Sequence, residues 1–549
     1  TPVMLAIKDV GQVETTAQGG RAAAELTIEN VHLWDGLKDP YLYTATATLG
    51  NGADSIETRF GCRTFEVDPE KGFFLNGHSY PLCGAARHQD REDVGYALTP
   101  AMHEEDMELL KEMGANTIRL AHYQHDQYFY DLCDEAGMVV WAEIPYISEH
   151  MPEANDNTAS QMTELVVQNY NHPSIICWGL SNEITSSGGE SEDLVENHKR
   201  LNDLCHKLDS TRPTTMAHVF MLPTSSELVQ LPDIRSYNLY YGWYLGEAND
   251  NDTWFDDFHA KYPNAAIGLS EYGADANPQY QTPCAERGDY TETYQAEYHE
   301  HMLAMWAKRP YIWAMHVWNM FDFAADGRDE GGKHGINQKG LVTFNRKTKK
   351  DAFYIYKAYL SRTPFVHLCG SRYVDRTEDV TTVKVYSNQP QVTLLMDGRE
   401  VATQDGDKIF TFQVPISGEH SVEARAQDCA AVMYIRKVEQ PNPDYMLAGA
   451  QIINWFDRED MEVREGFYCI KDTMADIKRS PQGAALLGAM MQKAVAARGD
   501  VAQGVQIPEE MQRMMDQTPL EKMLKSVGEV MSPEDIVQLN KALCQIPKV

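Results

Sequence analysis

The stretch "IICWGLSNE", residues 175–183, decides the fold of this chain. Its apolar beginning is long enough for a buried β-strand, and the run then ends on the polar pair Asn182 and Glu183. Seven other apolar runs of similar length have the same pattern, and segments with helical periodicity separate them. They occupy residues 81–88, 115–122, 138–145, 214–220, 234–240, 265–272 and 311–319. Eight alternating strand and helix units predict a (β/α)8 TIM barrel.

The segments on either side of this barrel, which we place at residues 68–362, have different patterns. Residues 1–67 and residues 363–438 consist of short alternating stretches bounded by Gly, Asn and Asp, which are typical of immunoglobulin-like β-sandwich domains. Residues 439–549 are rich in Met and Ala and contain helical segments that begin at Pro. The sequence therefore predicts a multidomain protein, with β-sandwich domains flanking a TIM barrel and a helical C-terminal region.

The composition argues against several classes of partner. With 81 acidic and 48 basic residues, the formal charge of −33 would repel nucleic acid and anionic membrane surfaces. The sequence has no apolar stretch long enough to span a membrane. The ten cysteines are scattered and form no CxxC pair, which favours reduced thiols and a cytoplasmic location. Because the chain opens on Thr1 rather than Met, we expect the natural protein to begin further upstream.

Two carboxylates, Glu183 and Glu271, end the fourth and seventh predicted strands. In a TIM barrel the carboxyl ends of the strands form the active site, so we expect both at the same mouth. Paired carboxylates on opposite sides of a pocket are what glycoside hydrolysis needs. Arg119 and Tyr240, at two other strand ends, favour an ionised Glu271 that acts as a nucleophile. Glu183 lies beside the amide of Asn182, and we expect it to keep a raised pKa and to act as acid and base.

Six motifs occur in order at the predicted strand ends and carry a family resemblance. They are "RHQD" (87–90), "GANTIRLAHY" (114–123), "GLSNE" (179–183), "YNLYYGWY" (237–244), "LSEYG" (269–273) and "VWNMFDF" (317–323). Together they resemble the retaining β-glycosidases of glycoside hydrolase family two, and the resemblance extends over residues 1–438. It implies that Glu183 is the acid/base and Glu271 the nucleophile. It further implies that Arg119 and Tyr240 hold Glu271 and that Asn182 contacts the 2-hydroxyl of the sugar. The residues expected to line the sugar subsite are His88, His122 and Trp318, and Asp90 is a further predicted substrate contact.

Two features depart from the pattern of that family. The family usually carries a jelly-roll domain before the first sandwich, and this chain begins after the point where that domain would end. The helical region beyond residue 440 also has no place in the basic plan. The resemblance implies that no cofactor is required. Relatives can bind magnesium beside the acid/base, but "EIPYISEHM" (143–151) does not match their ligand motif, so magnesium stays open and no metal ligand is predicted.

The residues after the eighth strand bear on the choice of sugar. Asn337 and Lys339 form an Asn-x-Lys triplet, which in β-glucuronidases holds the carboxylate of the sugar. The longer context looks more like the β-galactosidases, namely "RLAHYQHDQYFYDLCDEAGMVVWAEIPYISEHM" (119–151), "WNMFDFAADGRDEG" (318–331) and "GLVTFNRKTKKDAFY" (340–354). We therefore expect a retaining enzyme for terminal β-D-galactosides, with a β-glucuronidase or other β-uronide hydrolase as the alternative. A non-catalytic carbohydrate-binding protein is the third hypothesis. The expected partner is a carbohydrate, and the oligomeric state stays open, a homo-oligomer included.

Overall fold

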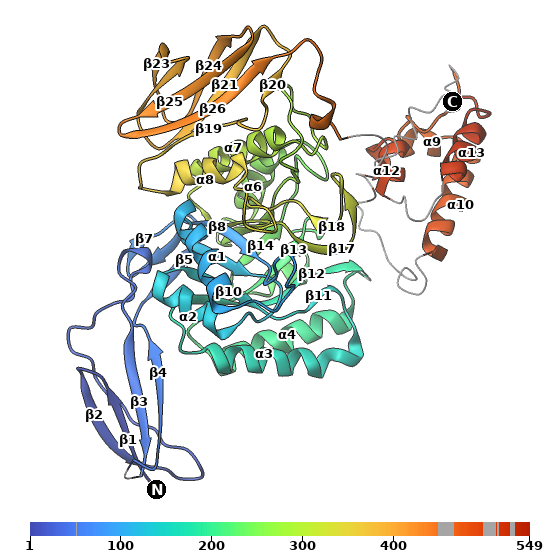
Figure 1. The fold of residues 1–549 in the computed structure, drawn as a ribbon. Helices are drawn as coiled ribbons and strands as arrows, with labels where there is room; N and C mark the ends of the chain where they lie inside the picture. Colours follow the sequence, from blue (N-terminus) through green and yellow to red (C-terminus); the bar gives the residue numbers. More distant parts are fainter. Residues whose placement is uncertain are drawn as a thin grey trace.

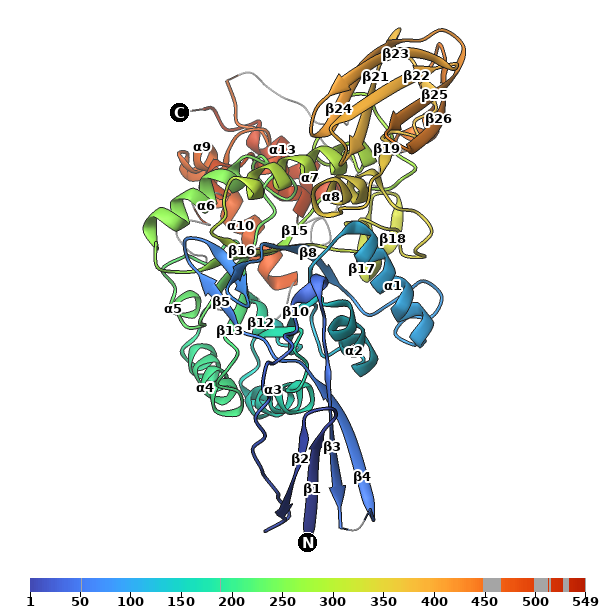
Figure 2. The same ribbon diagram turned by 90° about the vertical axis from the view of Figure 1, so that its left-hand side faces the viewer.

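The computed structural model describes residues 1–50, 52–187, 189–447, 466–497, 512, 515–526 and 533–548. Figures 1 and 2 show the N-terminal sheet at one end of the barrel and a second sheet-rich domain at the other end. The barrel with its flanking β-domains confirms the predicted fold class. Of the region predicted as helical, residues 448–465, 498–511, 513–514, 527–532 and 549 lie outside the described part of the chain.

The N-terminal region forms an antiparallel sheet of four strands in the order β2-β1-β3-β4. The strands are β1 (Pro2–Ile7), β2 (Gly11–Thr16), β3 (Tyr43–Leu49) and β4 (Asp54–Phe60). Trp34, on the segment between β2 and β3, is fully buried against the bottom of the barrel. Its indole Nε1 donates to the backbone oxygen of Asp134 at 2.9 Å. This contact anchors the N-terminal region to the barrel, because a buried indole needs a hydrogen-bond acceptor.

A small antiparallel sheet and the barrel follow. The small sheet consists of β5 (Phe65–Asp68), β6 (Gly72–Leu75) and β7 (His78–Ser79). The barrel strands are β8 (Leu82–Arg87), β9 (Thr117–Leu120), β10 (Val139–Glu143), β12 (Ile175–Ser187), β13 (Thr214–Val219), β14 (Arg235–Asn238), β15 (Ile267–Tyr272) and β16 (Ile312–Val317). All neighbours pair in parallel, and the pairing of β10 with β12 closes the circle. Each strand lies within one of the eight apolar runs or overlaps it. The short strand β11 (Ile147–Glu149) pairs with β12 outside the circle.

The helices that connect these strands lie around the barrel. They are α1 (Pro100–Met113), α2 (Gln127–Ala136), α3 (Asn155–Asn169), α4 (Glu192–Leu208), α5 (Glu227–Gln230), α6 (Asp250–Lys261), α7 (Glu292–Ala307) and α8 (Asp351–Leu360). Helix α1 starts at Pro100 and is capped at its C-terminal end by Gly114, whose φ of 86° favours a residue without a side chain. It buries Met107, Leu110 and Met113 against the barrel, as its apolar spacing predicts. The lower end of the barrel is filled by large rings, including those of Trp141 and Trp313, which stack at 5.9 Å.

Two further β-elements follow the barrel. The hairpin of β17 (Phe323–Glu330) and β18 (Lys333–Asn337) comes directly after the last barrel strand. The second β-domain contains β19 (Val366–Leu368), β20 (Asp375–Arg376), β21 (Val380–Ser387), β22 (Gln391–Met396), β23 (Arg399–Asp405), β24 (Lys408–Pro415), β25 (Glu419–Ala426) and β26 (Cys429–Lys437). Its sheets have the orders β19-β21-β24 and β20-β26-β25-β22-β23. They enclose an apolar core of their own that includes Val383, Phe412 and Val422. This core explains the alternation of apolar residues in the sequence.

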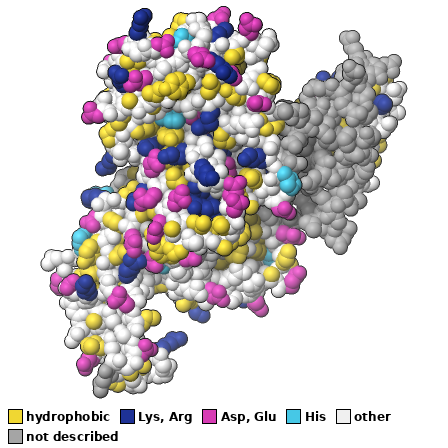
Figure 3. Space-filling view, in the orientation of Figure 1, with side chains coloured by type: hydrophobic (Ala, Val, Ile, Leu, Met, Phe, Trp, Pro, Cys, Tyr) yellow, Lys and Arg dark blue, Asp and Glu magenta, His cyan; other side chains and the backbone are white. Residues whose placement is uncertain are grey.

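The described C-terminal helices form a small unit. They are α9 (Met474–Lys478), α10 (Pro481–Ala497), α12 (Leu520–Ser526) and α13 (Pro533–Leu543). They pack around a separate apolar cluster that includes Met474, Leu487 and Leu524. Within the described part of the chain, we found no helix with the length and apolar character needed to cross a membrane. Over the face of the molecule in Figure 3, acidic and basic side chains are interspersed among apolar ones.

Candidate active site

The two candidate carboxylates lie on strands of the same parallel barrel. Glu183 is part of β12, and Glu271 is near the carboxyl end of β15. The backbone of Glu183 has a φ of 44°, a left-handed conformation that is uncommon for a residue with a side chain. Such backbone outliers concentrate at functional sites, where the surrounding structure holds them in place. Glu183 is partly buried, and Glu271 is only 5% exposed.

Glu271 is held from two sides. Nη1 of Arg119 donates to its Oε1 at 2.7 Å, and the hydroxyl of Tyr240 donates to its Oε2 at 2.8 Å. Each carboxylate oxygen therefore has a donor, and one of the donors carries a positive charge. The side chain is fixed in orientation, as a nucleophile that attacks along one line requires.

Arg119 connects Glu271 to two further polar residues. Its guanidinium donates to both oxygens of Glu143 at 2.9 Å and to Oδ1 of Asn182 at 2.9 Å. The remaining N–H group faces the backbone oxygen of Ser270 at 3.3 Å. All five N–H groups of the guanidinium thus have acceptors within the protein. Burial opposes the positive charge, but Glu143 and Glu271 together raise the pKa of Arg119. These contacts favour a positioning role for Arg119 over a direct contact with the sugar.

Glu183 has a different environment. Nδ2 of Asn238 donates to its Oε1 at 2.9 Å. Burial, followed by the negative charge of Glu271, raises the pKa of Glu183 to about 7. One carboxyl of the pair is therefore poised to carry a proton near neutral pH, while the other faces a cation. This division is the pattern of an acid/base and a nucleophile in retaining glycoside hydrolysis.

Aromatic rings form a wall beside these carboxylates. The rings of His122 and Trp318 stack at 4.9 Å, and the ring of His88 meets Trp318 edge-on at 5.2 Å and Phe323 at 4.4 Å. His122 is held by Oε1 of Glu143 at 2.8 Å. Burial lowers the pKa of His88 well below its usual range, so this ring is neutral. Such a wall suits the apolar face of a sugar ring, and the sugar contacts of these residues stay a prediction.

Asp90 lies where the β17–β18 hairpin begins. Its Oδ2 accepts from the backbone N–H of Ala324 at 2.9 Å, and among the described residues its buried Oδ1 has no hydrogen-bond partner. Burial raises the pKa of this carboxyl. One oxygen therefore holds the hairpin, and the other is available to a sugar hydroxyl, as the predicted substrate contact requires.

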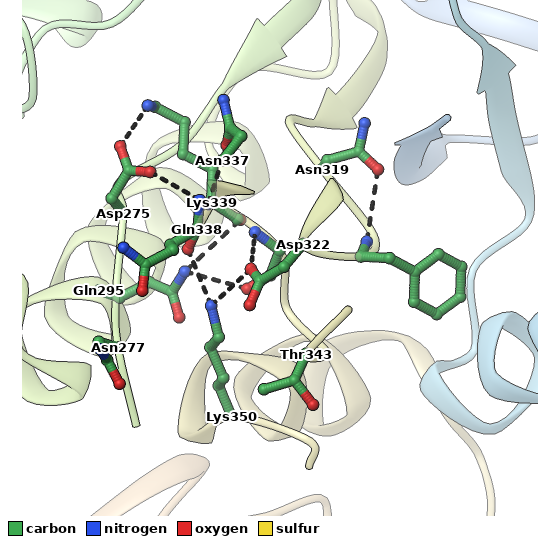
Figure 4. A network of polar contacts seen from close by, with 12 residues as sticks. Asp275, Asn277, Gln295, Asn319, Asp322, Asn337, Gln338, Lys339, Thr343 and Lys350 are labelled. Carbon is green, nitrogen blue, oxygen red and sulfur yellow. Dashed lines mark hydrogen bonds and ion pairs between the residues drawn. The ribbon is translucent and has the colours of Figure 1, made fainter. Parts of the chain in front are cut away.

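Asn337 and Lys339 are both buried and lie together at the end of the hairpin (Figure 4). Oδ1 of Asn337 accepts from the backbone N–H of Lys339 at 3.0 Å. The ammonium of Lys339 pairs with Asp275 and lies 5.9 Å from the ring centre of Tyr240. Tyr240 therefore lies beside Lys339 and also donates to Glu271. The Asn-x-Lys triplet thus belongs to the same site as the nucleophile.

The segment that carries Lys339 is fixed from below by Lys350. The ammonium of Lys350 donates to Oδ1 of Asp322 and to the backbone oxygen of Gln338, both at 2.8 Å. The same Asp322 oxygen accepts from the backbone N–H of Gly340 at 2.9 Å. Figure 4 shows these contacts on both sides of Lys339. The position of the Lys339 ammonium is therefore set by the backbone on either side of it.

Sequence reasoning missed three residues of this site, namely Asn238, Tyr244 and Asp275. Tyr244 and Asn238 stand inside the motif "YNLYYGWY", and Asp275 follows Glu271 by four residues. The hydroxyl of Tyr244 accepts from Lys339 at 2.7 Å. Burial favours a neutral Asp275, but Lys339 and Arg328 outweigh it and lower the pKa of this carboxyl. The signal that could have identified these three residues is their position close to the end of a barrel strand that carries a predicted site residue.

Two groups of side chains in the described part of the chain have the composition of a metal site. They are Asp351, His367 and Cys369, and Asp131, Asp134 and His172. In the first group, Asp351 already accepts from His367 at 2.8 Å and from the backbone of Gly370 at 2.7 Å. In the second, Asp134 accepts from His172 at 2.6 Å. Neither group includes a residue of the candidate active site, and magnesium stays open as at the sequence level.

The closed parallel barrel with two glutamates at its strand ends is typical of the TIM-barrel class of glycoside hydrolases. Residues 65–363 match the model described as glycosyl hydrolases family 2, TIM barrel domain, and residues 4–63 match a second model of glycosyl hydrolases family 2. The chain belongs to glycosyl hydrolases family 2. This confirms the family resemblance seen in the six motifs.

Several individual relatives within the family are beta-glucuronidases. The chain is 41% identical over 404 residues to a beta-glucuronidase of Bacteroides fragilis, covering 70% of this chain and 57% of the relative. A solved FMN-binding beta-glucuronidase from Facaelibacterium prausnitzii L2-6 superposes with a TM-score of 0.79 at 45% identity, covering 81% of this chain and 70% of that one. A Bacteroides uniformis beta-glucuronidase superposes with a TM-score of 0.73 at 32% identity, covering 80% and 57%. The chain spans about half the length of the curated relatives it matches.

The predicted preference for β-galactosides is wrong, because the relatives described above are beta-glucuronidases. That preference rested on the long context of residues 119–151, 318–331 and 340–354. In the structure the stretches 318–331 and 340–354 form mainly the hairpin and the support of the barrel mouth. Their site residue Trp318, like Arg119 and His122 of the first stretch, lies beside the catalytic glutamates and does not distinguish one sugar from another. The Asn-x-Lys triplet is the part that lies in the site, with the Lys339 ammonium beside Tyr240. The β-glucuronidase alternative fits the relatives better.

Proposed function

We propose that the protein hydrolyses terminal β-D-glucuronides with retention of configuration at the anomeric carbon. The observation that carries this proposal is the fully buried ammonium of Lys339, which lies beside the tyrosine that holds Glu271. A buried cation at the sugar site favours a sugar with a carboxylate, because a charge-assisted contact then offsets part of the cost of burial. The beta-glucuronidases among its relatives support the same conclusion.

The first half of the reaction uses both glutamates. The protonated carboxyl of Glu183, whose pKa is raised to about 7, donates its proton to the glycosidic oxygen. Glu271 attacks the anomeric carbon, the bond to the leaving group breaks, and a covalent glycosyl-enzyme forms. Arg119 and Tyr240 hold the two oxygens of Glu271 during this step.

The second half reverses these roles. Once Glu271 is esterified, its negative charge no longer raises the pKa of Glu183, so that pKa falls. Glu183, now ionised, takes a proton from water, and the water oxygen attacks the anomeric carbon and releases the sugar from Glu271. The change in charge at one glutamate therefore converts the other from acid to base. The cycle as written uses only the two glutamates and water.

Recognition of the uronate depends on Asn337 and Lys339. Asp275 pairs with the Lys339 ammonium and fixes its position. A hydroxymethyl group in place of the sugar carboxylate would lose the charge-assisted contact, which contributes about 2 to 5 kcal/mol in buried pairs.

The test compares 4-nitrophenyl β-D-glucuronide with 4-nitrophenyl β-D-galactoside. We expect faster cleavage of the glucuronide, and a loss of about 2 to 5 kcal/mol in kcat/KM on this substrate alone in Lys339→Met. Lys333→Met, which removes a charge from an exposed position of the same hairpin, is the matched control. Faster cleavage of the galactoside would reject the proposal. A complete lack of turnover with retained sugar binding would support the non-catalytic hypothesis.

A further inference from the structure

Asp106 of helix α1 lies between two buried arginines, close to the predicted substrate contact Asp90. Nε and Nη2 of Arg87 donate to Oδ2 of Asp106 at 3.0 and 2.8 Å. Nε and Nη2 of Arg346 donate to its Oδ1 and Oδ2 at 2.9 and 3.1 Å. All three side chains are 0% exposed. These three residues, the Asp106 cluster, join the end of β8, helix α1 and the segment that follows the β17–β18 hairpin.

Arg346 connects the Asp106 cluster to Asp90. Its Nη2 donates to the backbone oxygen of Asp90 at 2.8 Å, and its Nη1 donates to the backbone oxygen of Phe344 at 2.7 Å. The guanidinium carbon lies 3.8 Å from the ring centre of Phe321. The backbone of Arg346 has a φ of 62°, which residues with a side chain seldom adopt. The surrounding structure thus fixes Arg346 from several sides, and the backbone of Asp90 is fixed with it.

The Asp106 cluster carries more positive than negative charge. Arg87 and Arg346 are two buried cations against the single carboxylate of Asp106. Arg91 is a third cation, at 3.3 Å from Oδ1 of Asp106, and its Nη1 pairs with Glu105 at 2.7 Å. The Glu105 side chain is 52% exposed, so water screens its charge. A buried surplus cation is costly, and stability alone would need only one arginine for one aspartate.

The two histidines that contact Arg87 add no charge to the cluster. Nη2 of Arg87 lies 3.1 Å from Nδ1 of His103, and its Nη1 lies 3.2 Å from Nδ1 of His125. Burial, followed by the charge of Arg87, lowers the pKa of His103 to about 4 and that of His125 well below its usual range. Both rings are therefore neutral.

Asp90 is the carboxyl group that balances the surplus charge. It is 3% exposed, and the charged groups that act on it are Arg346 and Arg87, which favour its ionised form, and Asp106, which opposes it. Its Oδ2 accepts from the backbone of Ala324, and its Oδ1 has no hydrogen-bond partner in the described part of the chain. One buried oxygen beside a surplus cation is therefore left for a donor such as a hydroxyl.

We infer that Arg346 is a positioning residue that acts on the sugar through Asp90, and that Asp106 orients Arg346 for this role. The inference rests on the proposed function, because it requires a sugar hydroxyl at the free oxygen of Asp90. Arg346 holds the backbone of Asp90 and Ala324 holds one carboxylate oxygen, so the other oxygen has a fixed direction. Such an acceptor binds a hydroxyl more strongly than a mobile one, because it loses little freedom when the sugar binds.

The first experiment is a double-mutant cycle of Asp90→Asn and Arg346→Lys, with kcat/KM for 4-nitrophenyl β-D-glucuronide as the readout. Asp90→Asn should lower kcat/KM about ten- to a hundredfold, mainly through a higher KM. Arg346→Lys keeps the charge but cannot bind Asp106 and the backbone of Asp90 together, so it should lower kcat/KM less, about three- to tenfold. Because Arg346 acts through Asp90, the double variant should lose no more than Asp90→Asn alone.

Two controls separate positioning from stability. Lys347→Met removes a cation from the exposed position next to Arg346. Arg212→Lys disturbs another buried pair, in which Nη1 of Arg212 lies 2.7 Å from Oδ2 of Asp209, and Nε of Arg212 donates to Ile175 at the opposite end of the barrel. Arg212→Lys should lower the Tm but keep the KM of the wild type, and Lys347→Met should keep both. An equal rise of KM in Arg212→Lys would overturn the inference, since lost stability would then explain both variants.

The acidic limb of the pH profile of kcat/KM is a second readout. Arg346→Met removes the charge that favours ionised Asp90, so the limb should move to higher pH, and it should stay in place when Asp90→Asn is already present. A limb that moves in both backgrounds, or losses that multiply in the double variant, would overturn the role of Arg346 and leave the proposed function intact. If the wild type cleaves no glucuronide, the proposed function falls, and a crystal structure of Arg346→Lys decides the positioning role. An Asp90 carboxylate displaced from the N–H of Ala324 would support it, and an unmoved one would overturn it.

Discussion

The alkaline limb of the pH profile tests the proton that we assign to Glu183. Cleavage requires a protonated Glu183, so kcat/KM should fall as the pH rises through the pKa of this carboxyl. Burial and the charge of Glu271 raise that pKa to about 7. The limb is expected near that pH, and because the two glutamates interact, its midpoint belongs to the pair.

The informative perturbation is Asn238→Leu, which keeps most of the side-chain volume and removes the donor at 2.9 Å from Oε1 of Glu183. That hydrogen bond favours the ionised form of Glu183, so its loss raises the pKa. A hydrogen bond to a charged group contributes about 1.5 to 3 kcal/mol, and a pKa unit corresponds to about 1.4 kcal/mol. The alkaline limb should therefore move up by about one to two pH units.

The assay is the pH dependence of kcat/KM for 4-nitrophenyl β-D-glucuronide. Ser270→Ala is the control, because the Ser270 hydroxyl donates to Oδ1 of Asn238 at 2.7 Å but no contact joins it to Glu183 in the described structure. Its limb should stay close to that of the wild type. A limb that does not move in Asn238→Leu, or one that persists at the same pH in Glu183→Gln, would refute the assignment, since another group would then be titrating.

Three further predictions address the other roles. Glu271→Gln should lower turnover of the nitrophenyl glucuronide by several orders of magnitude while the circular dichroism spectrum stays unchanged. Near-native activity in this variant would contradict the nucleophile role of Glu271. In Glu183→Ala, added azide should restore turnover of this activated substrate by replacing water as the attacking group, and a folded variant without rescue would count against the acid/base. Arg119→Lys keeps the charge but cannot bind Glu143, Asn182 and Glu271 together, so kcat should fall even though the net charge is unchanged, as steady-state kinetics would show.

The barrel could be predicted from the sequence because each of its strands is a short apolar run with a polar end. A strand that is buried on both faces has few polar residues, so it appears in the sequence as a continuous apolar run. Eight such runs separated by helical segments predict a closed barrel of eight strands. Glu183 and Glu271 could be predicted for the same reason, because both follow the apolar part of a buried strand. Their unequal environments also followed from Arg119 and Tyr240, which the structure places on Glu271.

The rest depends on contacts between segments far apart in the chain. Asp275 and Lys339 are 64 positions apart, and only the closed structure shows that the ammonium has a carboxylate partner before any substrate binds. Asp106 carries no sequence signal, because its position on helix α1 means little until Arg87 and Arg346 lie against it. The sugar was wrongly predicted because the long sequence context was given more weight than the Asn-x-Lys triplet, which lies in the site.

The contacts of Arg119 have a consequence for how the protein folds. One guanidinium joins side chains or backbone of four barrel strands, β9, β10, β12 and β15, whose residues extend from Thr117 to Ser187 and from Ile267 to Tyr272. No local segment can assemble this centre, since its partners lie up to 152 positions apart. Such distant contacts form late, after the loops between them have closed. During refolding, hydrolysis should therefore recover together with the last step of barrel closure, after helical structure has returned.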